Sequence, residues 1–180
     1  LKEAFADVQG ARLYVTAVEL GTGELRIFGD DPADPLLDAT MTSTALPPYL
    51  PPWRCDGRWY MDGGAAACLP LSAALERSAT EIYALDLTYT GCPRASIHGV
   101  IPILFQAADI MVHQLRQRDL AEARQQLGAK LHYVSLAPDK NLSPFDFRHA
   151  GELIEEGRRR MAAHLEAQTC SSSPGGGEAK

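Results

Sequence analysis

The sequence has few of the residues that metal and redox sites use. Its four cysteines form no C-x-x-C pair, and none of its five histidines stands in an H-E-x-x-H or another ligand spacing. We therefore expect no metal site and no cofactor. So sparse a set of cysteines predicts free thiols in a reducing compartment, with a bridge between Cys55 and Cys68 as the alternative.

The sequence also lacks an excess of basic residues and a long apolar run. The net charge is -6, and because phosphate binding rests on clustered Lys and Arg, a nucleic-acid partner is not expected. The most apolar stretch, Val100 to Phe105, contains Pro102 and runs into Gln106. A membrane-spanning helix needs about 20 apolar residues. We expect no transmembrane segment and a protein that is cytoplasmic or peripherally bound to membranes.

What is present is the composition of a folded domain. With 180 residues, 46% of them hydrophobic and 22% charged, the chain can form one domain with a hydrophobic core. The Ser- and Gly-rich end predicts a disordered tail at 169–180, which leaves a domain at 1–168. The first residue is Leu1 and the sequence starts in mid-pattern. We interpret it as a fragment whose N-terminal part is missing.

Runs rich in β-forming residues alternate with segments that have a helical apolar stripe. Strands are predicted near Leu13–Leu20, Glu24–Phe28, Arg58–Met61, Glu81–Leu87 and Lys130–Leu136. The first two strands should form a hairpin around Gly21–Gly23. Helices are predicted at Pro35–Ala45, at Leu71–Ser78, at about Ser96–Gln126, and from Ser143-Pro144 onward. This alternation predicts a layered α/β domain.

Three local features complete the predicted pattern. In the long helix at about Ser96–Gln126, one stripe is predicted to be buried: Val100, Leu104, Ala107, Ala108, Met111, Val112 and Leu115. Pro47 to Trp53 is predicted to be a proline-rich loop. Asp56-Gly57 is a turn signal.

One acidic residue stands at the end of a predicted strand. Asp62 follows Arg58–Met61 and is followed at once by Gly63 and Gly64. The strand fixes the direction of the carboxylate, and the glycines allow unusual backbone angles and a close approach of another segment. The alternative is a turn aspartate, because Asp-Gly is also an ordinary turn dipeptide.

The stretch around Asp62 resembles the patatin-like phospholipase family. The matching motifs are Ser43-Thr44-Ala45-Leu46-Pro47, Asp62-Gly63-Gly64, Leu69-Pro70 and the strand Glu81 to Asp86, in the family's order and spacing. The resemblance implies a three-layer α/β/α fold, with a mostly parallel sheet that includes an antiparallel hairpin. This chain would be the C-terminal part of that domain.

The resemblance also implies a lipid acyl-ester hydrolase that uses a Ser-Asp dyad. Asp62 would be the catalytic aspartate, and Gly63 and Gly64 would form the active-site loop. The implied partner is a lipid ester, including one presented at a membrane surface. The family's serine lies in a G-x-S-x-G elbow upstream of the hairpin, and no serine of this sequence has that context. The nucleophile is therefore absent from this chain, and the chain alone is expected to be inactive.

A second interpretation belongs to a different class of function. The chain would then be a non-catalytic module that binds lipid or a partner and retains the fold. Cys68, where the family often has asparagine, favours this alternative slightly, because cysteine hydrogen-bonds a loop poorly. Five large apolar residues either line an acyl pocket or belong to the core, and the core is favoured. They are Leu46, Tyr49, Leu50, Trp53 and Trp59.

Overall fold

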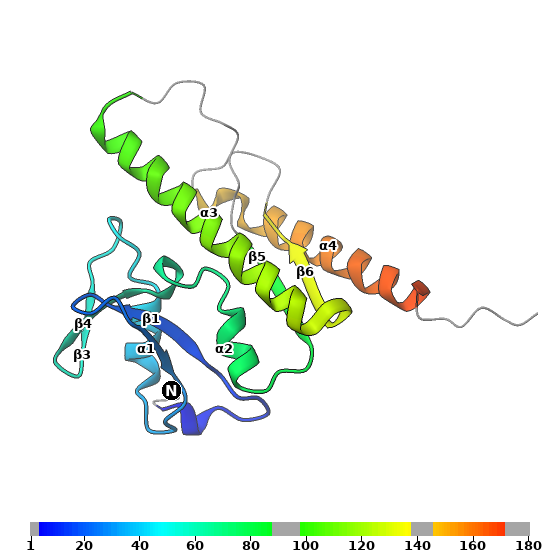
Figure 1. Ribbon diagram of the computed structural model, residues 1–180, viewed down its shortest axis with the longest axis horizontal. Coiled ribbons are helices and arrows are strands. Elements are labelled where there is room, and N and C mark those ends of the chain that lie inside the picture. Colours follow the sequence, from blue (N-terminus) through cyan, green and yellow to red (C-terminus); the bar gives the residue numbers. More distant parts are fainter. Residues whose placement is uncertain (1–3, 88–97, 138–145, 172–180) are drawn as a thin grey trace, which may run out of the picture. The chain divides into compact units, whose positions relative to one another are not determined.

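The computed structural model describes residues 4–87, 98–137 and 146–171 (Figure 1). The chain divides into two compact units. The first unit consists of Leu1–Thr80 with His98–Lys130, and the second of Glu81–Ile97 with Leu131–Lys180. Each unit contains both strands and helices, so the predicted α/β class is confirmed.

The first unit is built on a four-stranded sheet in the order β2-β1-β4-β3. Its strands are β1 (Val15–Glu19), β2 (Leu25–Phe28), β3 (Trp53–Cys55) and β4 (Arg58–Asp62). The predicted hairpin of β1 and β2 is confirmed, since Val15 pairs with Phe28 and Val18 with Leu25. The N–H of Gly23 closes its turn by donating to the carbonyl of Glu19 at 2.8 Å.

The expectation of a mostly parallel sheet is wrong. All three pairings in the four-stranded sheet are antiparallel, and only β5 (Ile82–Asp86) and β6 (Leu131–Ser135) pair in parallel within the described residues. For two of the three pairings the reason is the length of the connections. Parallel neighbours need a crossover of a dozen or more residues, whereas short turns join β1 to β2 and β3 to β4. The three-layer arrangement stays a prediction.

Strand β3 was not predicted, because the preceding prolines point to a loop that extends through Trp53. The chain nevertheless pairs Trp53 with Tyr60 and Cys55 with Arg58 across the predicted turn at Asp56-Gly57. Asp56 has φ 50° and Gly57 has φ 78°. Positive φ at both central residues is the type I′ geometry that suits a two-residue hairpin and favours Asp-Gly.

Two short helices belong to this part of the chain. Helix α1 (Leu36–Ser43) lies between β2 and β3 in the sequence, and α2 (Leu71–Glu76) follows β4. The core cluster of the unit combines residues from the strands, from α1 and from the start of the chain. Its buried members are Phe5, Ala17, Phe28, Ala39, Cys55 and Tyr60. The rings of Phe28 and Tyr60 meet edge to face, with centroids 6.0 Å apart. Strands β1, β2, β3 and β4 thus share one apolar core.

The long helix α3 (Val100–Leu127) is confirmed, with Pro102 in its first turn. The predicted buried stripe is wrong, because none of its seven residues is buried. Val100 is 82% exposed, Leu104 67% and Met111 63%. The buried residues of α3 lie toward its C-terminal end: Arg116, Leu120 and Ala123. The sequence period identifies a face of a helix, but that face is buried only where another element covers it.

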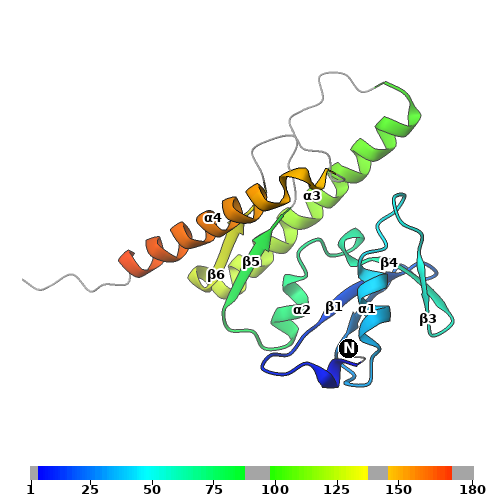
Figure 2. The ribbon, with the colours of Figure 1, turned by 180° about the vertical axis from the view of Figure 1, so that it is seen from behind.

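The second unit contains β5, β6 and helix α4 (Ala150–Ser171), which Figure 2 labels from the other side. The two parallel strands pair from Ile82 opposite Leu131 to Asp86 opposite Ser135. Asp86 is buried at the end of β5, and its carboxylate accepts a hydrogen bond from the hydroxyl of Tyr133 at 2.7 Å.

Helix α4 begins later than predicted. Ser143 and Pro144 lie outside the described residues, and the helix starts at Ala150 after a 3-10 turn at Phe147–His149. The side chain of Asp146 caps this turn by accepting from the N–H of Arg148 at 3.2 Å. The helix extends to Ser171, and residues 172–180 of the predicted tail lie outside the described part. The boundary at residue 168 stays a prediction.

Candidate functional site

Asp62 is the last residue of β4, as predicted, and it is half-buried. It pairs with Ala17 of β1, and its backbone N–H donates to the carbonyl of Ala45 at 3.0 Å. Its carboxylate Oδ1 accepts the N–H of Gly64 at 2.7 Å. That hydrogen bond fixes one oxygen of the carboxylate.

Gly63 is required by the close approach of β1. A Cβ placed on Gly63 would lie 2.4 Å from Oγ1 of Thr16 and 2.6 Å from its carbonyl oxygen. No side chain fits at that distance, so the glycine lets the chain turn immediately after Asp62 while it stays against β1. Unusual backbone angles are not the reason, because neither Gly63 nor Gly64 has a positive φ.

The loop after Asp62 is held by its own backbone. Residues Gly63–Ala65 form a 3-10 turn capped by Asp62, and the carbonyl of Gly63 accepts the N–H groups of Ala66 and Ala67 at 3.1 and 2.9 Å. Cys68 follows this turn and is half-buried. Cys55 is a free thiol in the core, so the alternative bridge between Cys55 and Cys68 is not formed.

The preference for a core role is wrong for most of the five large apolar residues discussed above. Leu46, Tyr49, Leu50 and Trp59 are each about half exposed. Trp53 does pack against the core, and its indole N–H donates to a carboxylate oxygen of Asp38 at 2.9 Å.

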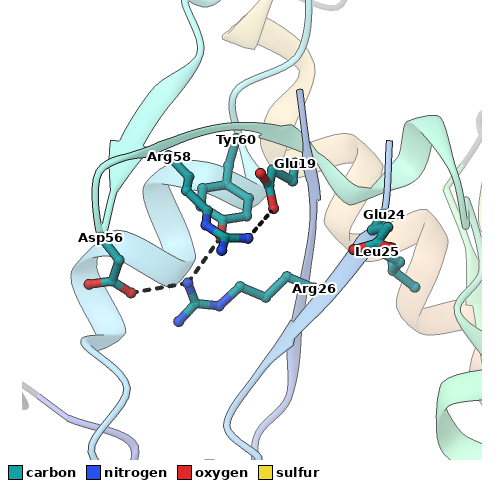
Figure 3. A pocket seen from close by; sticks show the side chains of 7 residues that line it. All are labelled: Glu19, Glu24, Leu25, Arg26, Asp56, Arg58 and Tyr60. Carbon is teal, nitrogen blue, oxygen red and sulfur yellow. Dashed lines mark hydrogen bonds and ion pairs between the residues drawn. The ribbon is translucent and has the colours of Figure 1, made fainter. Parts of the chain in front are cut away.

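A polar pocket lies elsewhere on the four-stranded sheet, and Asp62 is not among its lining residues. Its volume is about 520 Å³, and the lining consists of Glu19, Glu24, Leu25, Arg26, Asp56, Arg58 and Tyr60 (Figure 3). The guanidinium of Arg26 donates to Asp56 at 3.1 Å, to Tyr60 at 3.2 Å and to Asp34 at 3.2 Å.

Both arginines of this pocket are paired with carboxylates. Partial burial acts to lower the pKa of Arg26, but its hydrogen bonds to Tyr60, Asp56 and Asp34 outweigh that effect and raise the pKa above its ordinary value. Arg58 donates to Glu19 at 2.8 Å in the same pocket. We interpret the cluster as structural. Sequence analysis missed it because the partners of Arg26 lie 8, 30 and 34 residues away along the chain.

Within the described ranges, no group of three or more His, Cys, Asp or Glu side chains is arranged to hold a metal ion. In the same ranges, no helix is both long and apolar enough to cross a bilayer.

The comparison with protein families identifies the segment that contains the candidate site. Residues 4–75 match the family model described as Patatin-like phospholipase. The matched span includes both hairpins of the four-stranded sheet, helix α1 and the Asp62-Gly63-Gly64 loop, and it reaches into α2. The resemblance inferred from the motifs is thereby confirmed.

Proposed function

We propose, from the match of residues 4–75 to the patatin-like phospholipase family model, that this chain is part of a lipid acyl-ester hydrolase. In the complete protein a serine would attack the ester carbonyl, and Asp62 would take up the serine's proton. This chain supplies the aspartate but not the serine. No metal or cofactor takes part in the proposed reaction.

The geometry of Asp62 carries this proposal. Serine is a weak nucleophile and needs an adjacent base held in a fixed position. Asp62 meets that need, because pairing with Ala17 holds its backbone and the Gly64 N–H holds one carboxylate oxygen at 2.7 Å. The half-buried side chain stays accessible to a partner group. An aspartate that only caps a turn makes the same hydrogen bond to the backbone two residues on, so the Asp62→Asn experiment below decides between the two roles.

The alternative is a non-catalytic module that binds lipid or a partner through the same fold. It is favoured by the absence of a G-x-S-x-G serine from these 180 residues and by Cys68. The two functions differ in one measurable respect. Only the hydrolase loses an activity when the carboxylate of Asp62 is removed.

The experiment compares Asp62→Asn with the parent in the longest natural chain that contains these residues. Asparagine has the same shape and still accepts the Gly64 N–H, but it cannot serve as the base. Because general-base assistance is worth about a hundredfold to ten-thousandfold, ester turnover should fall by that factor at an unchanged melting temperature.

Asp56→Asn is the matched control. Asp56 occupies the type I′ turn, where asparagine is equally suitable, and its carboxylate pairs with Arg26 at an exposed position. We expect nearly parental turnover and stability. Parental turnover in Asp62→Asn would refute the dyad, and a much lower melting temperature of that variant would identify Asp62 as a structural turn residue.

The 180-residue chain alone should not hydrolyse short-chain nitrophenyl esters, because it contains no serine in the required context. Sustained turnover by the purified chain, above the background of the buffer and of host protein purified in the same way, would show that a different nucleophile operates.

A further inference from the structure

The N-terminal half of α3 carries an exposed apolar surface for which the proposed reaction has no use. Its exposed large residues are Val100, Ile101, Ile103, Leu104, Ile110 and Met111. At 3.6 residues per turn, the side chains of Ile103, Val100, Leu104 and Ile101 fan out over about 160° of the helix circumference. Soluble proteins rarely expose so continuous an apolar patch without a partner.

The apolar and polar residues of α3 are divided along the helix axis. Residues 100–112 include one charged side chain, that of Asp109, whereas residues 113–127 include five. The five are Arg116, Arg118, Asp119, Glu122 and Arg124. This division, with an apolar N-terminal half and a charged C-terminal half, fits a planar boundary between an apolar and an aqueous phase.

The proline-rich loop after α1 extends this surface. The rings of Tyr49 and Phe105 are stacked, with centroids 6.2 Å apart and an interplanar angle of 26°. This contact places the half-exposed Leu46, Tyr49 and Leu50 beside the apolar part of α3. A tyrosine at such a position suits a boundary between lipid and water, because its ring is apolar and its hydroxyl is polar.

The same loop begins next to the candidate catalytic residue. The carbonyl of Ala45, directly before Leu46, accepts the backbone N–H of Asp62 at 3.0 Å. The exposed apolar surface and Asp62 therefore belong to one continuous part of the first unit.

We propose that this docking surface, made of α3 residues 100–111 with Leu46, Tyr49 and Leu50, inserts into the surface of a zwitterionic phospholipid layer. The inference rests on the proposed function, whose lipid substrate is presented in such layers. The docking surface carries no basic residue, and the whole chain has a net charge of -6, so attraction to anionic headgroups does not contribute. At about 1.5 Å of rise per residue, the apolar part of α3 is about 18 Å long.

The test is flotation with phosphatidylcholine vesicles of the same long natural chain that is used for the turnover comparison. The parent should float with the vesicles, and the double variant Ile101→Asp/Leu104→Asp should bind at least tenfold more weakly. Leu37→Asp is the matched control, since Leu37 on α1 is 68% exposed and lies outside the docking surface. It should bind like the parent. Raising the salt concentration should leave binding unchanged, because no ion pairing is involved.

The double variant Ile101→Ala/Leu104→Ala keeps a good helix former at both positions. It replaces the aspartate variant in the test if that variant has a much lower melting temperature than the parent. It should also weaken vesicle binding. Parental binding by both double variants, or equal loss in Leu37→Asp, would overturn the proposal. A parent protein that does not bind the vesicles would overturn it as well. If that parent sediments as a dimer and the Ile101→Asp/Leu104→Asp variant as a monomer, the surface binds a second copy of the chain instead.

The outcome is independent of catalysis. Vesicle binding requires no hydrolysis, so Asp62→Asn should float like the parent. Loss of turnover in Asp62→Asn together with unchanged flotation of the surface variants would retain the hydrolase and reject the docking surface.

Discussion

The two sheets of this protein are built from connections of very different length. In the first unit, β1 and β2 are joined by a short glycine turn and β3 and β4 by the two residues Asp56-Gly57. In the second unit, β5 and β6 pair in parallel although 44 residues separate Asp86 from Leu131. A short hairpin loses little loop entropy on closing, whereas a parallel pair must close a long one.

The difference explains where a precisely oriented side chain can be supported. Asp62 ends a strand that has a neighbour on each side, β1 and β3, and the chain next to it is fixed by backbone hydrogen bonds. The described part of the β5-β6 sheet has two strands only. Its buried acid, Asp86, is held by Tyr133 from one neighbouring strand. At Asp62 itself, the pairing with Ala17 of β1 and the bond from its N–H to Ala45 both hold the backbone, so the position of Asp62 does not depend on a single contact.

Among the substitutions that test this difference between the two sheets, Gly63→Ala should lower the free energy of unfolding most. The added methyl group would overlap the backbone of Thr16, with distances below 3 Å to three of its atoms. Either β1 or the loop after Asp62 must move. We expect a loss of about 3 kcal/mol in the free energy of unfolding, measured by urea denaturation, because overpacking typically costs 1–3 kcal/mol and backbone atoms yield least.

Gly64→Ala is the neighbouring control. Its Cβ would approach only Oδ1 of Asp62, at 3.1 Å, and its φ is not positive. The cost should be well under that of Gly63→Ala. Equal stability of the Gly63 variant and the parent would mean that β1 and the loop are not tightly packed, and the argument for an oriented Asp62 would fail with it.

Much of the fold was predictable because its signals are local. The glycines at 21 and 23, the Asp56-Gly57 turn and the apolar period of α3 each act over a few residues, and the elements they predict are present. Strand β3 was missed because the prolines up to position 52 predict a loop. The strand has three residues only, and it forms by pairing with β4 across the Asp56-Gly57 turn. The direction of the strands came from the family resemblance, and the short connections contradict it.

The candidate site was predictable for a different reason. A carboxylate between a strand and two glycines is visible in the sequence. The role of Gly63, however, depends on Thr16 of another strand, whose Oγ1 lies 2.4 Å from the position that a methyl group on Gly63 would take. The Arg26 cluster depends on three distant partners in the same way. Burial on α3 was mispredicted along the whole stripe, from Val100 to Leu115, since periodicity identifies a face of a helix but not the element that would cover it.

A smaller effect should come from the thiol of Cys55 in the core of the first unit. Burial, and then the nearby carboxylates of Asp56 and Asp38, raise the pKa of Cys55 to about 11. A raised pKa means that the fold favours the neutral thiol. Its stabilising contribution is therefore complete below the unfolded pKa of about 9 and is lost as the pH rises through about 11.

Urea denaturation between pH 8 and pH 11 measures this contribution. The parent should lose up to about 2 kcal/mol more than Cys55→Ala over that range, since one pKa unit corresponds to about 1.4 kcal/mol. Tyrosine and lysine titrate in both proteins, so the difference isolates the thiol. If the free energies of unfolding of the two proteins changed with pH in the same way, water would reach Cys55 and the core of the first unit would not be tightly packed.

The smallest effect should come from Gly157→Ala in α4 of the second unit, and its sign is opposite to that of Gly63→Ala. A Cβ at Gly157 meets no atom within 4 Å, and the residue lies inside a helix. Alanine should therefore stabilise the helix by about 0.5–1 kcal/mol, because glycine loses more backbone entropy on folding. Both tryptophans of the chain lie in β3 and β4, so tryptophan fluorescence reports on the first unit. Circular dichroism at 222 nm reports on both units, because α3 belongs to the first unit and α4 to the second. If the two units unfold separately, Gly157→Ala should raise only the part of the circular dichroism transition that does not coincide with the fluorescence change, and Gly63→Ala should lower the fluorescence midpoint together with the remaining part. Equal shifts in both signals would show that the short-loop and long-loop sheets unfold as one cooperative structure, and the support for Asp62 would then extend beyond its own sheet.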